Sequence, residues 1–268
     1  MPEIASAKLS IRPERLPRGA HMRVLDVGCG DGRHIIEAAK RGCFTVGVDY
    51  DAAELRKARQ RIGAHRVDLV AADASHLPFR DAAFDAVICT ETLEHLPDDA
   101  GAIAEIARAM RDGGTLHGAV PSHFTEIPFW KLSRGYYETP GGHVRIYAPK
   151  VLFRRLCDAG LAVTDFRYVH FVDSLFWLRF CLVDFVRPTK PKSDFEAAVL
   201  IAVAAERRVP AWRRHLREAM RTSRFIAAID GAGALIWPKS LTFVARKQAM
   251  SQLPSTDTAR ARSTVRSL

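Results

Sequence analysis

The sequence has 268 residues, of which 48% are hydrophobic and 26% are charged. These values are typical of a soluble globular protein with one large domain, or one domain with an insertion, and they exclude a chain too polar to bury a core. No run of 18 uncharged apolar residues is present, so a membrane-spanning helix is not expected. Residues 1–20 lack the apolar segment of a signal peptide.

The charge of the chain is unevenly distributed. The formal net charge is +10 and the isoelectric point is near 9.7. Residues 170–268 contain 17 Lys or Arg and 8 Asp or Glu, whereas residues 1–169 contain 23 and 22. The basic C-terminal third favours an anionic surface or substrate nearby. Genome composition is an equally weighted alternative origin of the arginines.

The five cysteines are scattered through the chain, odd in number and without a C-x-x-C pair. This distribution favours reduced thiols over a disulfide framework or a zinc site. The expected location is therefore the cytoplasm.

An apolar run meets a glycine-rich turn at residues 24–33, which read Val-Leu-Asp-Val-Gly-Cys-Gly-Asp-Gly-Arg, and a helical pattern follows. Glycines at positions 28, 30 and 32 permit sharp bends and close approach of a ligand. Such a turn aims free backbone N–H groups above the end of the strand. The pattern predicts a strand, a ligand-binding turn and a helix.

A second strand, at residues 44–49, ends in Asp49 about twenty residues after the turn. A carboxylate there can accept both hydroxyls of a ribose. The glycine spacing differs from the G-x-G-x-x-G of dinucleotide sites. Asp26 would repel a pyrophosphate, but it can face the ammonium group of a zwitterionic ligand. An ordinary strand–helix turn and another nucleotide-type ligand are the alternatives.

Strands and helices alternate through the first 120 residues. The expected strands are 23–27, 44–49, 67–73, 84–90 and 115–120. The expected helices are 32–41, 52–62 and 99–110. Asp51 and Asp98 are suitable N-caps for the last two helices, and Asp112-Gly113-Gly114 is expected to form a turn after the third.

The C-terminal half is less regular. Residues 121–143 are aromatic, Gly-rich and Pro-rich and are predicted to be irregular; they include Tyr136 and Tyr137. A helix at 149–159, a sixth strand at 161–170 and a seventh, antiparallel strand at 240–246 are expected. Between the last two strands we expect three helices, at 173–187, 193–208 and 211–228.

These elements predict an α/β fold: a Rossmann-like, seven-stranded, mostly parallel sheet with helices on both faces, plus a helical insertion between strands six and seven. Ligands of such sheets bind at the carboxyl ends of the strands. The expected segments are a lead at 1–22, a cofactor-binding core at 23–170, an insertion at 171–238, the last strand at 239–248 and a disordered tail at 249–268. The insertion is expected to cover substrate or to bind a partner.

Four motifs resemble those of the class I S-adenosylmethionine (SAM) dependent methyltransferases. Residues 24–33 and 46–50 resemble the first two motifs, and Asp73 matches the third. Residues 84–98, Phe-Asp-Ala-Val-Ile-Cys-Thr-Glu-Thr-Leu-Glu-His-Leu-Pro-Asp, resemble the fourth in the form seen in the type 11 group and the ubiquinone-biosynthesis O-methyltransferases. The segment that begins Gly142-His143-Val-Arg-Ile-Tyr is also similar to that group. The resemblance covers about 24–170 plus the last strand.

The resemblance implies SAM as cofactor, with S-adenosylhomocysteine as product. The cofactor-binding residues that it implies are Asp26, Gly28, Cys29, Gly30, Asp49, Tyr50, Asp73, Ala74, Thr90 and Glu91. It places Asp73 against the adenine amine; a turn aspartate is the alternative. Tyr50 can stack on the adenine or be an ordinary surface aromatic.

Methyl transfer to an oxygen needs alignment of the acceptor and a general base. His143 and His95 are the candidate catalytic residues, because histidine titrates near neutral pH. We favour His143, which ends the aromatic segment that can form an acceptor pocket. His143 can instead pack on Tyr147, and His95 can instead hold its loop. No metal-ligand spacing is present, so no metal is expected.

Residues 175–187 are strongly apolar and aromatic, and basic pairs follow at 207–208 and 213–214. This stretch can line a lipid-sized tunnel or contact an anionic membrane peripherally; a buried helix or a homodimer contact is the alternative. The expected acceptor is a small, partly hydrophobic metabolite such as a lipid, quinone, polyketide or glycolipid, methylated on an oxygen, with a carbon as the alternative. A nucleic-acid methyltransferase and a non-catalytic SAM-binding module are the alternative functions, although nucleic acid is not an expected partner.

Overall fold

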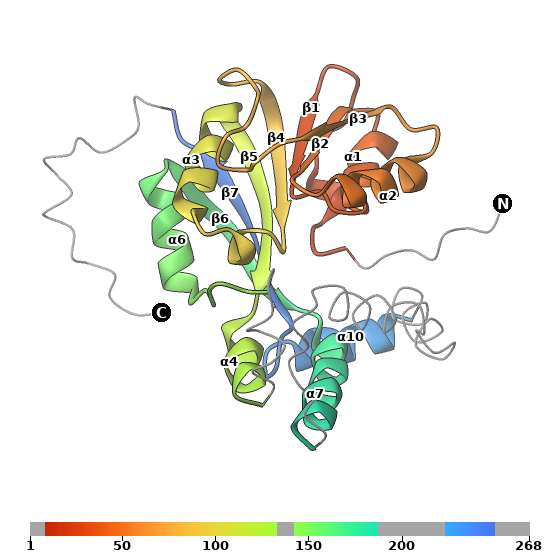
Figure 1. The fold of residues 1–268 in the computed structure, drawn as a ribbon, viewed down its shortest axis with the longest axis vertical. Helices are drawn as coiled ribbons and strands as arrows, with labels where there is room; N and C mark the ends of the chain where they lie inside the picture. Colours follow the sequence, from red (N-terminus) through yellow and green to blue (C-terminus); the bar gives the residue numbers. More distant parts are fainter. Residues whose placement is uncertain (1–8, 133–141, 187–222, 250–268) are drawn as a thin grey trace, which may run out of the picture.

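The computed structural model describes residues 9–132, 142–186 and 223–249. Seven strands form one sheet in the order β3-β2-β1-β4-β5-β7-β6 (Figure 1). β7 runs antiparallel to both β5 and β6, and the other pairs are parallel. The strands are β1 Arg23–Val27, β2 Phe44–Asp49, β3 Val67–Ala71, β4 Phe84–Thr90, β5 Met110–Pro121, β6 Leu161–Val169 and β7 Ser240–Lys247. The predicted α/β fold with a mostly parallel sheet is confirmed.

Helices cover both faces of the sheet. Successive residues of a strand point to opposite faces, and most residues of the central strands are apolar, so both faces need to be buried. In β1, Leu25 and Val27 join the main core under α3 and α6, whereas Val24 packs with Ala38 of α1. These helices are α1 Ile35–Lys40, α2 Ala52–Ile62, α3 Asp99–Ala109 and α6 Pro149–Asp158. The elements outside the sheet layers are η1 Pro13–Arg15, η2 Leu93–His95, α4 His123–Leu132, α7 Phe171–Val186 and α10 Arg224–Gly233.

The predicted caps are present. The Asp51 carboxylate accepts the N–H of Ala53 at 2.6 Å, and that of Asp98 accepts the N–H of Gly101 at 2.8 Å. These bonds satisfy N–H groups that the first turn of a helix leaves without a partner. The first helix, predicted at 32–41, is shorter at Ile35–Lys40, and the third strand, predicted at 67–73, ends at Ala71.

The expected turn at 112–114 is wrong. β5 begins at Met110, directly after α3, and continues through Asp112, Gly113 and Gly114. Its pairing with β4 shifts register between Phe84 and Ala86, and Gly113 has a φ of +73°. The glycines therefore form an irregularity within the strand and do not end the helix.

The prediction that 121–143 is irregular is wrong for α4. Its buried positions are Thr125, Glu126 and Phe129, whereas its apolar residues 124, 127 and 130 are exposed. Two of the three buried positions are polar and three apolar residues are exposed, so the apolar residues do not follow the spacing by which a surface helix is predicted from sequence. Ser122 directly precedes the helix, and its hydroxyl accepts the N–H of Phe124 in the first turn at 3.3 Å. Residues 133–141, with Tyr136 and Tyr137, lie outside the described part of the chain.

Two helices lie between β6 and β7 in the described residues. α7 at 171–186 matches the helix expected at 173–187, and α10 at 224–233 begins inside the helix expected at 211–228 and extends beyond it. The helix expected at 193–208 and the tail at 250–268 lie outside the described residues. None of the described helices is long and apolar enough to cross a bilayer.

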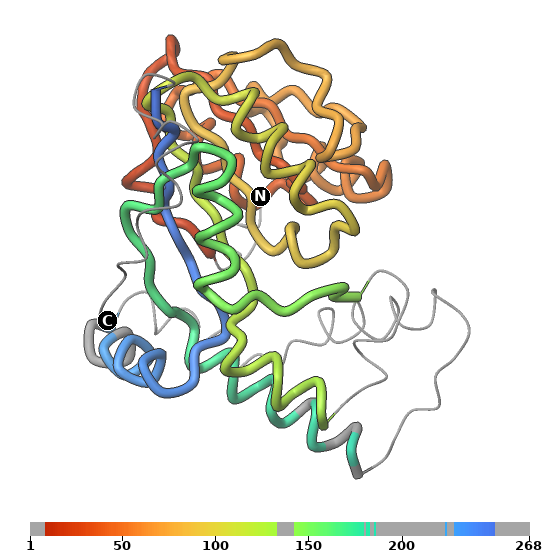
Figure 2. The backbone as a smooth tube through the Cα atoms, turned by 90° about the vertical axis from the view of Figure 1, so that its left-hand side faces the viewer, coloured from red at the N-terminus to blue at the C-terminus, as the bar shows by residue number. Residues whose placement is uncertain are grey.

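α4, α7 and α10 project from one edge of the sheet, where β5 and β6 end (Figures 1 and 2). Phe129 of α4 packs with Cys181, Trp177 and Leu178 of α7 and with Trp237. Because β5 and β6 run parallel to β1, β2 and β4 in the sheet, these helices stand at the edge where ligands of such folds bind. Leu175, Leu182 and Phe185 of α7 are exposed.

Candidate active site

Three strand ends meet beside the glycine turn. Val27 of β1 lies opposite Val48 of β2 and Cys89 of β4. Gly28, Asp49 and Thr90 are the next residues of the three strands, so the parallel register brings them to one edge of the sheet. The sequence predicts this convergence from spacing alone, and the register accounts for it.

The glycine turn folds over the end of β2. Gly28 and Gly30 have φ values of +69° and +50°, a region that favours glycine. The N–H groups of Gly28 and Cys29 donate to the Val48 carbonyl at 2.8 and 2.9 Å. The Gly30 N–H donates to Asp49 Oδ2 at 2.8 Å. Burial raises the pKa of the Cys29 thiol, which keeps it protonated.

Gly28→Ala is expected to destabilise the protein strongly. A Cβ there would lie 2.3 Å from the Thr92 hydroxyl, in a backbone conformation that already costs a side chain roughly 1–2 kcal/mol. Gly42→Ala is the matched control, because Gly42 also has a positive φ but its Cβ would meet open space. Urea unfolding should show a larger loss of stability for Gly28→Ala. Equal losses would contradict close packing of the turn.

Asp49 is fixed at the end of β2 by backbone groups. Its Oδ2 accepts the Gly30 N–H, and its Oδ1 accepts the Asp51 N–H at 2.9 Å. Each carboxylate oxygen can accept a further bond. The geometry therefore suits a carboxylate that receives ligand hydroxyls beside the turn.

Asp49→Ala is expected to lower affinity for S-adenosylhomocysteine by at least about 100-fold, because the ribose hydroxyls lose a charged acceptor. Calorimetry of the variant against wild type measures the loss. Asp68→Ala is the control, because Asp68 is an exposed acid on neighbouring β3. Unchanged affinity of Asp49→Ala would exclude the ribose role.

Asp26 is fully buried at the turn. Neither of its carboxylate oxygens has a hydrogen-bond partner among the described residues. Burial raises the pKa of Asp26 to about 8 and the nearby Asp49 charge adds to the shift, whereas the Arg33 charge and the nearby backbone N–H of Ile35 oppose it. A buried, unpaired carboxyl costs stability unless a cation binds to it. It suits the ammonium group of an amino-acid ligand.

Tyr50, Asp73 and Ala74 follow the ends of β2 and β3. Tyr50 is 85% exposed, and Ala74 is buried. Asp73 Oδ1 accepts both the N–H and the hydroxyl of Ser75 at 2.8 Å, and these bonds lower the pKa of Asp73. The Asp73 side chain is half exposed, so this carboxylate remains accessible to an adenine amine.

Thr90 is engaged by a histidine that the sequence did not reveal. The Ser10 N–H donates to His34 Nε2 at 3.2 Å, and burial lowers the pKa of His34 to about 3. The ring is therefore neutral with its proton on Nδ1, which donates to Thr90 Oγ1 at 2.9 Å. These bonds tie the N-terminal segment to the end of β4. Glu91, the next residue, has a φ of +52° and one buried carboxylate oxygen without a partner among the described residues.

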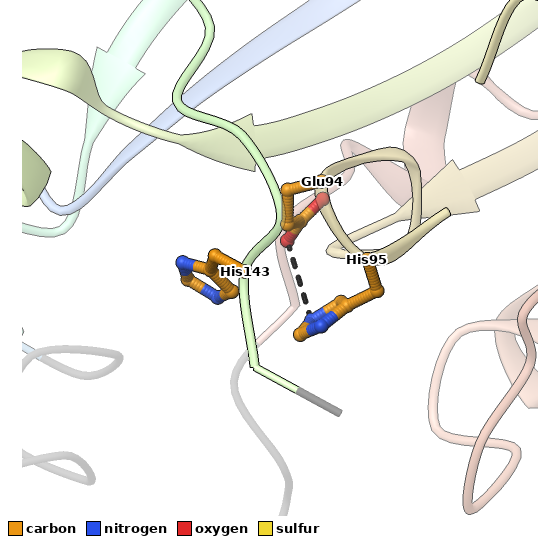
Figure 3. A group of neighbouring side chains, drawn as sticks. All are labelled: Glu94, His95 and His143. Carbon is orange, nitrogen blue, oxygen red and sulfur yellow. Dashed lines mark ion pairs between the residues drawn. The ribbon is translucent and has the colours of Figure 1, made fainter. Parts of the chain in front are cut away.

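His143 and His95 lie side by side. Their rings meet edge to face with centroids 4.8 Å apart, and His95 Nδ1 is 3.3 Å from the Gly142 carbonyl. The carboxylate of Glu94 completes this cluster, and its Oε1 is 3.9 Å from His95 Nε2 (Figure 3). One ligand atom from each residue lies within 4.8 Å of the others, so within the described part of the chain these three side chains are a group that could hold a metal ion. The spacing of these residues in the sequence does not predict a metal there.

Glu94 is buried, and burial raises the pKa of Glu94, with the nearby Glu91 charge adding to the shift. Neither of its oxygens has a hydrogen-bond partner among the described residues. Burial therefore favours the protonated form of this carboxyl, which can donate a hydrogen bond as well as accept one.

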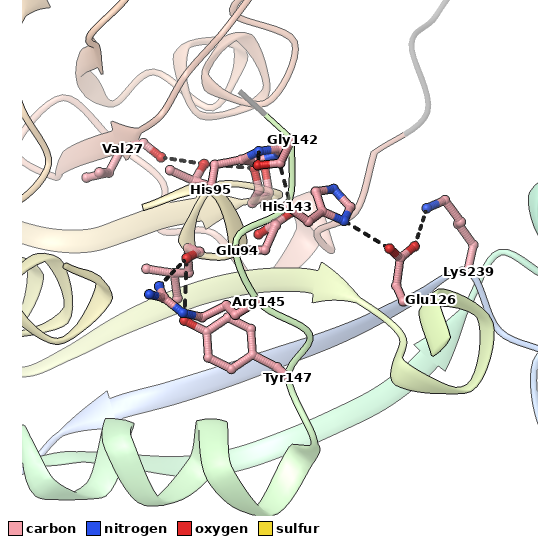
Figure 4. Close-up of polar contacts among 12 residues, drawn as sticks. Val27, Glu94, His95, Glu126, Gly142, His143, Arg145, Tyr147 and Lys239 are labelled. Atoms are coloured by element: carbon pink, nitrogen blue, oxygen red, sulfur yellow. Dashed lines mark hydrogen bonds and ion pairs between the residues drawn. The ribbon is translucent and has the colours of Figure 1, made fainter. Parts of the chain in front are cut away.

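His143 also contacts α4. Its Nδ1 lies 2.9 Å from Oε2 of buried Glu126, whose Oε1 accepts from Lys239 Nζ at 3.2 Å (Figure 4). Sequence reasoning missed Glu126 and Lys239, because they lie 17 and 96 residues from His143 and carry no motif. Tyr147, the alternative neighbour of His143, is buried and hydrogen-bonds Asp99.

Arg145 fastens the segment that carries His143. Its guanidinium donates to the carbonyls of Leu93, Leu96 and Pro97 around η2 and pairs with Asp99 at 3.2 Å. The Val144 N–H donates to the Glu94 carbonyl at 2.9 Å. These bonds hold residues 142–147 against the loop after β4, which also contacts the glycine turn. The loop after β4 therefore contacts both the glycine turn and the segment that carries His143.

The strand order places the buried carboxyl of Asp26 and the carboxylates of Asp49 and Asp73 at one edge of an α/β sheet. Residues 25–117 match the family described as "Methyltransferase domain". This part of the chain is similar to SAM-dependent methyltransferase domains, which use SAM as their cofactor. The unpartnered Asp26 carboxyl fits a cofactor that carries an ammonium group.

Several curated relatives are similar over this domain. Methyltransferase GfsG of Streptomyces halstedii is 39% identical over 108 residues, which are 38% of this chain and 39% of the relative. The 27-O-demethylrifamycin SV methyltransferase of Amycolatopsis mediterranei is 37% identical over 106 residues, with the same shares. Demethylmenaquinone methyltransferase of Roseiflexus castenholzii is 38% identical over 96 residues, which are 35% of this chain and 40% of the relative. The chain thus spans about two fifths of the length of these relatives.

Solved structures are similar in fold across more of the chain. The YcgJ protein of Bacillus subtilis matches with a TM-score of 0.55 and 19% identity, over 88% of this chain and 96% of the other. The [4+2]-cyclase SpnF matches with a TM-score of 0.53 and 22% identity, over 87% and 77%. These likenesses show the fold alone.

Proposed function

We propose that the protein transfers a methyl group from SAM to an oxygen of a small, partly hydrophobic metabolite. The observation that carries the proposal is the buried, unpaired carboxyl of Asp26 at the glycine turn, beside the backbone-held carboxylate of Asp49. Asp26 would pair with the ammonium group of SAM, and Asp49 would accept hydrogen bonds from its ribose hydroxyls. Asp73 would take the adenine amine, and Tyr50 would lie against the ring.

His143 is the proposed general base. SAM supplies a methyl group already activated on a sulfonium, so the protein has to place the acceptor in line and remove its proton. His143 is held by the carboxylate of Glu126 and by the ring of His95. A histidine held in this way can take a proton from an acceptor hydroxyl. We assign His95 the role of a second site residue that borders the same acceptor.

The proposed acceptor class comes from the relatives and from the helices. Two of the relatives are named as methyltransferases for 27-O-demethylrifamycin SV and for demethylmenaquinone, a polyketide-type compound and a quinone. α4 and α7 present apolar side chains at the ligand edge of the sheet. Lipids and glycolipids belong to the same proposed class, and carbon is the alternative methylated atom.

The proposed role of residues 171–238 is to cover this acceptor. Exposed Leu182 and Phe185 of α7 and the basic charge of the C-terminal third suit a peripheral contact with an anionic membrane. A homodimer that buries the same residues is the alternative proposal.

Two other functions stay as alternatives. A nucleic-acid methyltransferase is favoured by the net charge of +10, but the Thr-Glu-Thr-Leu after β4 differs from the Asn-Pro-Pro-Tyr type of sequence that holds a flipped base amine. A non-catalytic SAM-binding module would keep Asp26 and Asp49 and would have no use for His143.

Transfer of tritium from methyl-labelled SAM to a cell extract tests the proposal. We expect label in the lipid-soluble, small-molecule fraction. Label in RNA or DNA, lost at higher salt, would favour the nucleic-acid alternative. SAM binding without any labelled product would favour the binding module.

A further inference from the structure

We propose that Glu126, braced by Lys239, is a positioning residue that sets the tautomer of His143. The inference rests on the proposed function, because the ring nitrogen of a histidine that takes up the acceptor's proton has to be the one without its own hydrogen. The three residues come from three separate parts of the fold: Glu126 from α4, His143 from the segment before α6, and Lys239 from the position directly before β7.

Glu126, His143 and Lys239 form a buried hydrogen-bonded triad in which the lysine charge balances that of the carboxylate. Glu126 is 1% exposed, and the His143 side chain is 10% exposed. The carboxylate uses one oxygen for His143 Nδ1, at 2.9 Å, and the other for Lys239 Nζ, at 3.2 Å (Figure 4). A buried carboxylate is costly without a cation, and the Lys239 ammonium supplies one.

The carboxylate fixes which ring nitrogen carries the proton. An ionised Glu126 can only accept hydrogen bonds, so the neutral His143 ring must carry its proton on Nδ1. The lone pair is then on Nε2, the nitrogen on the other side of the ring from α4. In serine proteases an acid acts on a catalytic histidine in the same way, and the wrong tautomer costs about 10⁴-fold in turnover.

Lys239 is itself placed by the projecting helices. Its ammonium lies 5.1 Å from the ring centroid of Trp177 on α7, which is close enough for a cation–π contact. Its carbonyl accepts the Ser122 N–H at 2.9 Å, and the neighbouring Pro238 carbonyl accepts the Thr125 hydroxyl at 3.1 Å. α4 and α7, which lie at the ligand edge of the sheet, thus also fix the position of Lys239.

Replacement of Glu126 by glutamine gives a specific expectation. A glutamine side chain has one acceptor oxygen. Lys239 can only donate, so we expect that oxygen to accept the hydrogen bond from Lys239. The amide NH₂ then faces His143 Nδ1 and donates to it, which moves the ring proton to Nε2. In the double variant Glu126→Gln/Lys239→Met the amide is free to turn its oxygen toward Nδ1, so the original tautomer returns.

Long-range ¹H–¹⁵N spectra of histidine-labelled protein read the tautomer directly and need no acceptor. We would record them at about pH 9, above the ordinary histidine range, and assign His143 by loss of its signals in His143→Gln. The ratio of the Nδ1–H to the Nε2–H form should fall at least about tenfold in Glu126→Gln, as one ordinary hydrogen bond supports. The double variant should recover it.

Glu54→Gln is the matched control, because Glu54 also pairs with a lysine, Lys57, but does so on the exposed surface of α2; it should leave the His143 signals unchanged. A wild-type ring with its proton on Nε2, or an unchanged ratio in Glu126→Gln, would overturn the inference. Tritium transfer reports separately on the proposed function, so the two can fail independently.

Discussion

Asp26→Asn is expected to lower affinity for SAM by about 100-fold and, at the same time, to make the ligand-free protein more stable. The carboxyl is fully buried without a hydrogen-bond partner among the described residues, so its ionisation is useful only when a cation lies beside it. The amide keeps the shape of the side chain but cannot pair with an ammonium group. Calorimetry measures the affinity, and urea unfolding measures the stability.

The stability effect has a defined pH dependence. In the unfolded chain the carboxyl ionises near pH 4, whereas in the folded protein its pKa is about 8. Between these values the folded state holds the extra proton, so wild-type stability falls as pH rises through this window. The loss is at most roughly 5 kcal/mol at pH 8.

Asp26→Asn should lack this part of the slope, so its advantage over wild type should grow from about pH 4 to pH 8. Asp68→Asn, an exposed acid on β3, is the control and should follow wild type. If Asp26→Asn is less stable than wild type at pH 8, then Asp26 has a stabilising partner in the folded protein and is not reserved for a ligand.

His143→Ala is expected to lower turnover by about 10²–10⁴-fold and to leave affinity for SAM unchanged. The histidine is the proposed base for the acceptor hydroxyl, and loss of a general base costs this much. Among the described residues its ring contacts Glu126 and His95, which lie on the acceptor side of the proposed site, so affinity for the cofactor should not depend on it. The assay uses the acceptor fraction identified by tritium transfer.

His65→Ala, which alters an exposed histidine between α2 and β3, should keep wild-type turnover. Normal turnover of His143→Ala with an oxygen-methylated product would place the base elsewhere, with His95→Ala the next variant to test. A loss below about tenfold with a carbon-methylated product would indicate an activated carbon acceptor, which needs only positioning.

Local sequence signals were sufficient for the cofactor half of the site. β1, β2 and β4 begin and end where predicted, because each is an apolar run that a polar residue or glycine ends. The parallel register then brings Gly28, Asp49 and Thr90 together without further information. That Asp26 is buried without a partner is a tertiary result, since it depends on which neighbours fail to reach it.

The acceptor half could not be predicted in this way. α4 buries polar Thr125 and Glu126 and exposes apolar residues, so its periodicity misleads. Lys239 reaches Glu126 from 113 residues away, and such a pair has no local pattern. Arg145 bonds three backbone carbonyls, which leave no mark on the sequence.

A crystal structure of the protein with S-adenosylhomocysteine would show directly whether the ligand lies at the ends of β1 and β2. We expect hydrogen-bond distances from the Asp26 carboxyl to the ligand's ammonium group and from Asp49 to its ribose hydroxyls, with the adenine beside Asp73. A ligand bound away from the ends of β1 and β2, or an Asp26 carboxyl that stays without a partner in the complex, would contradict it.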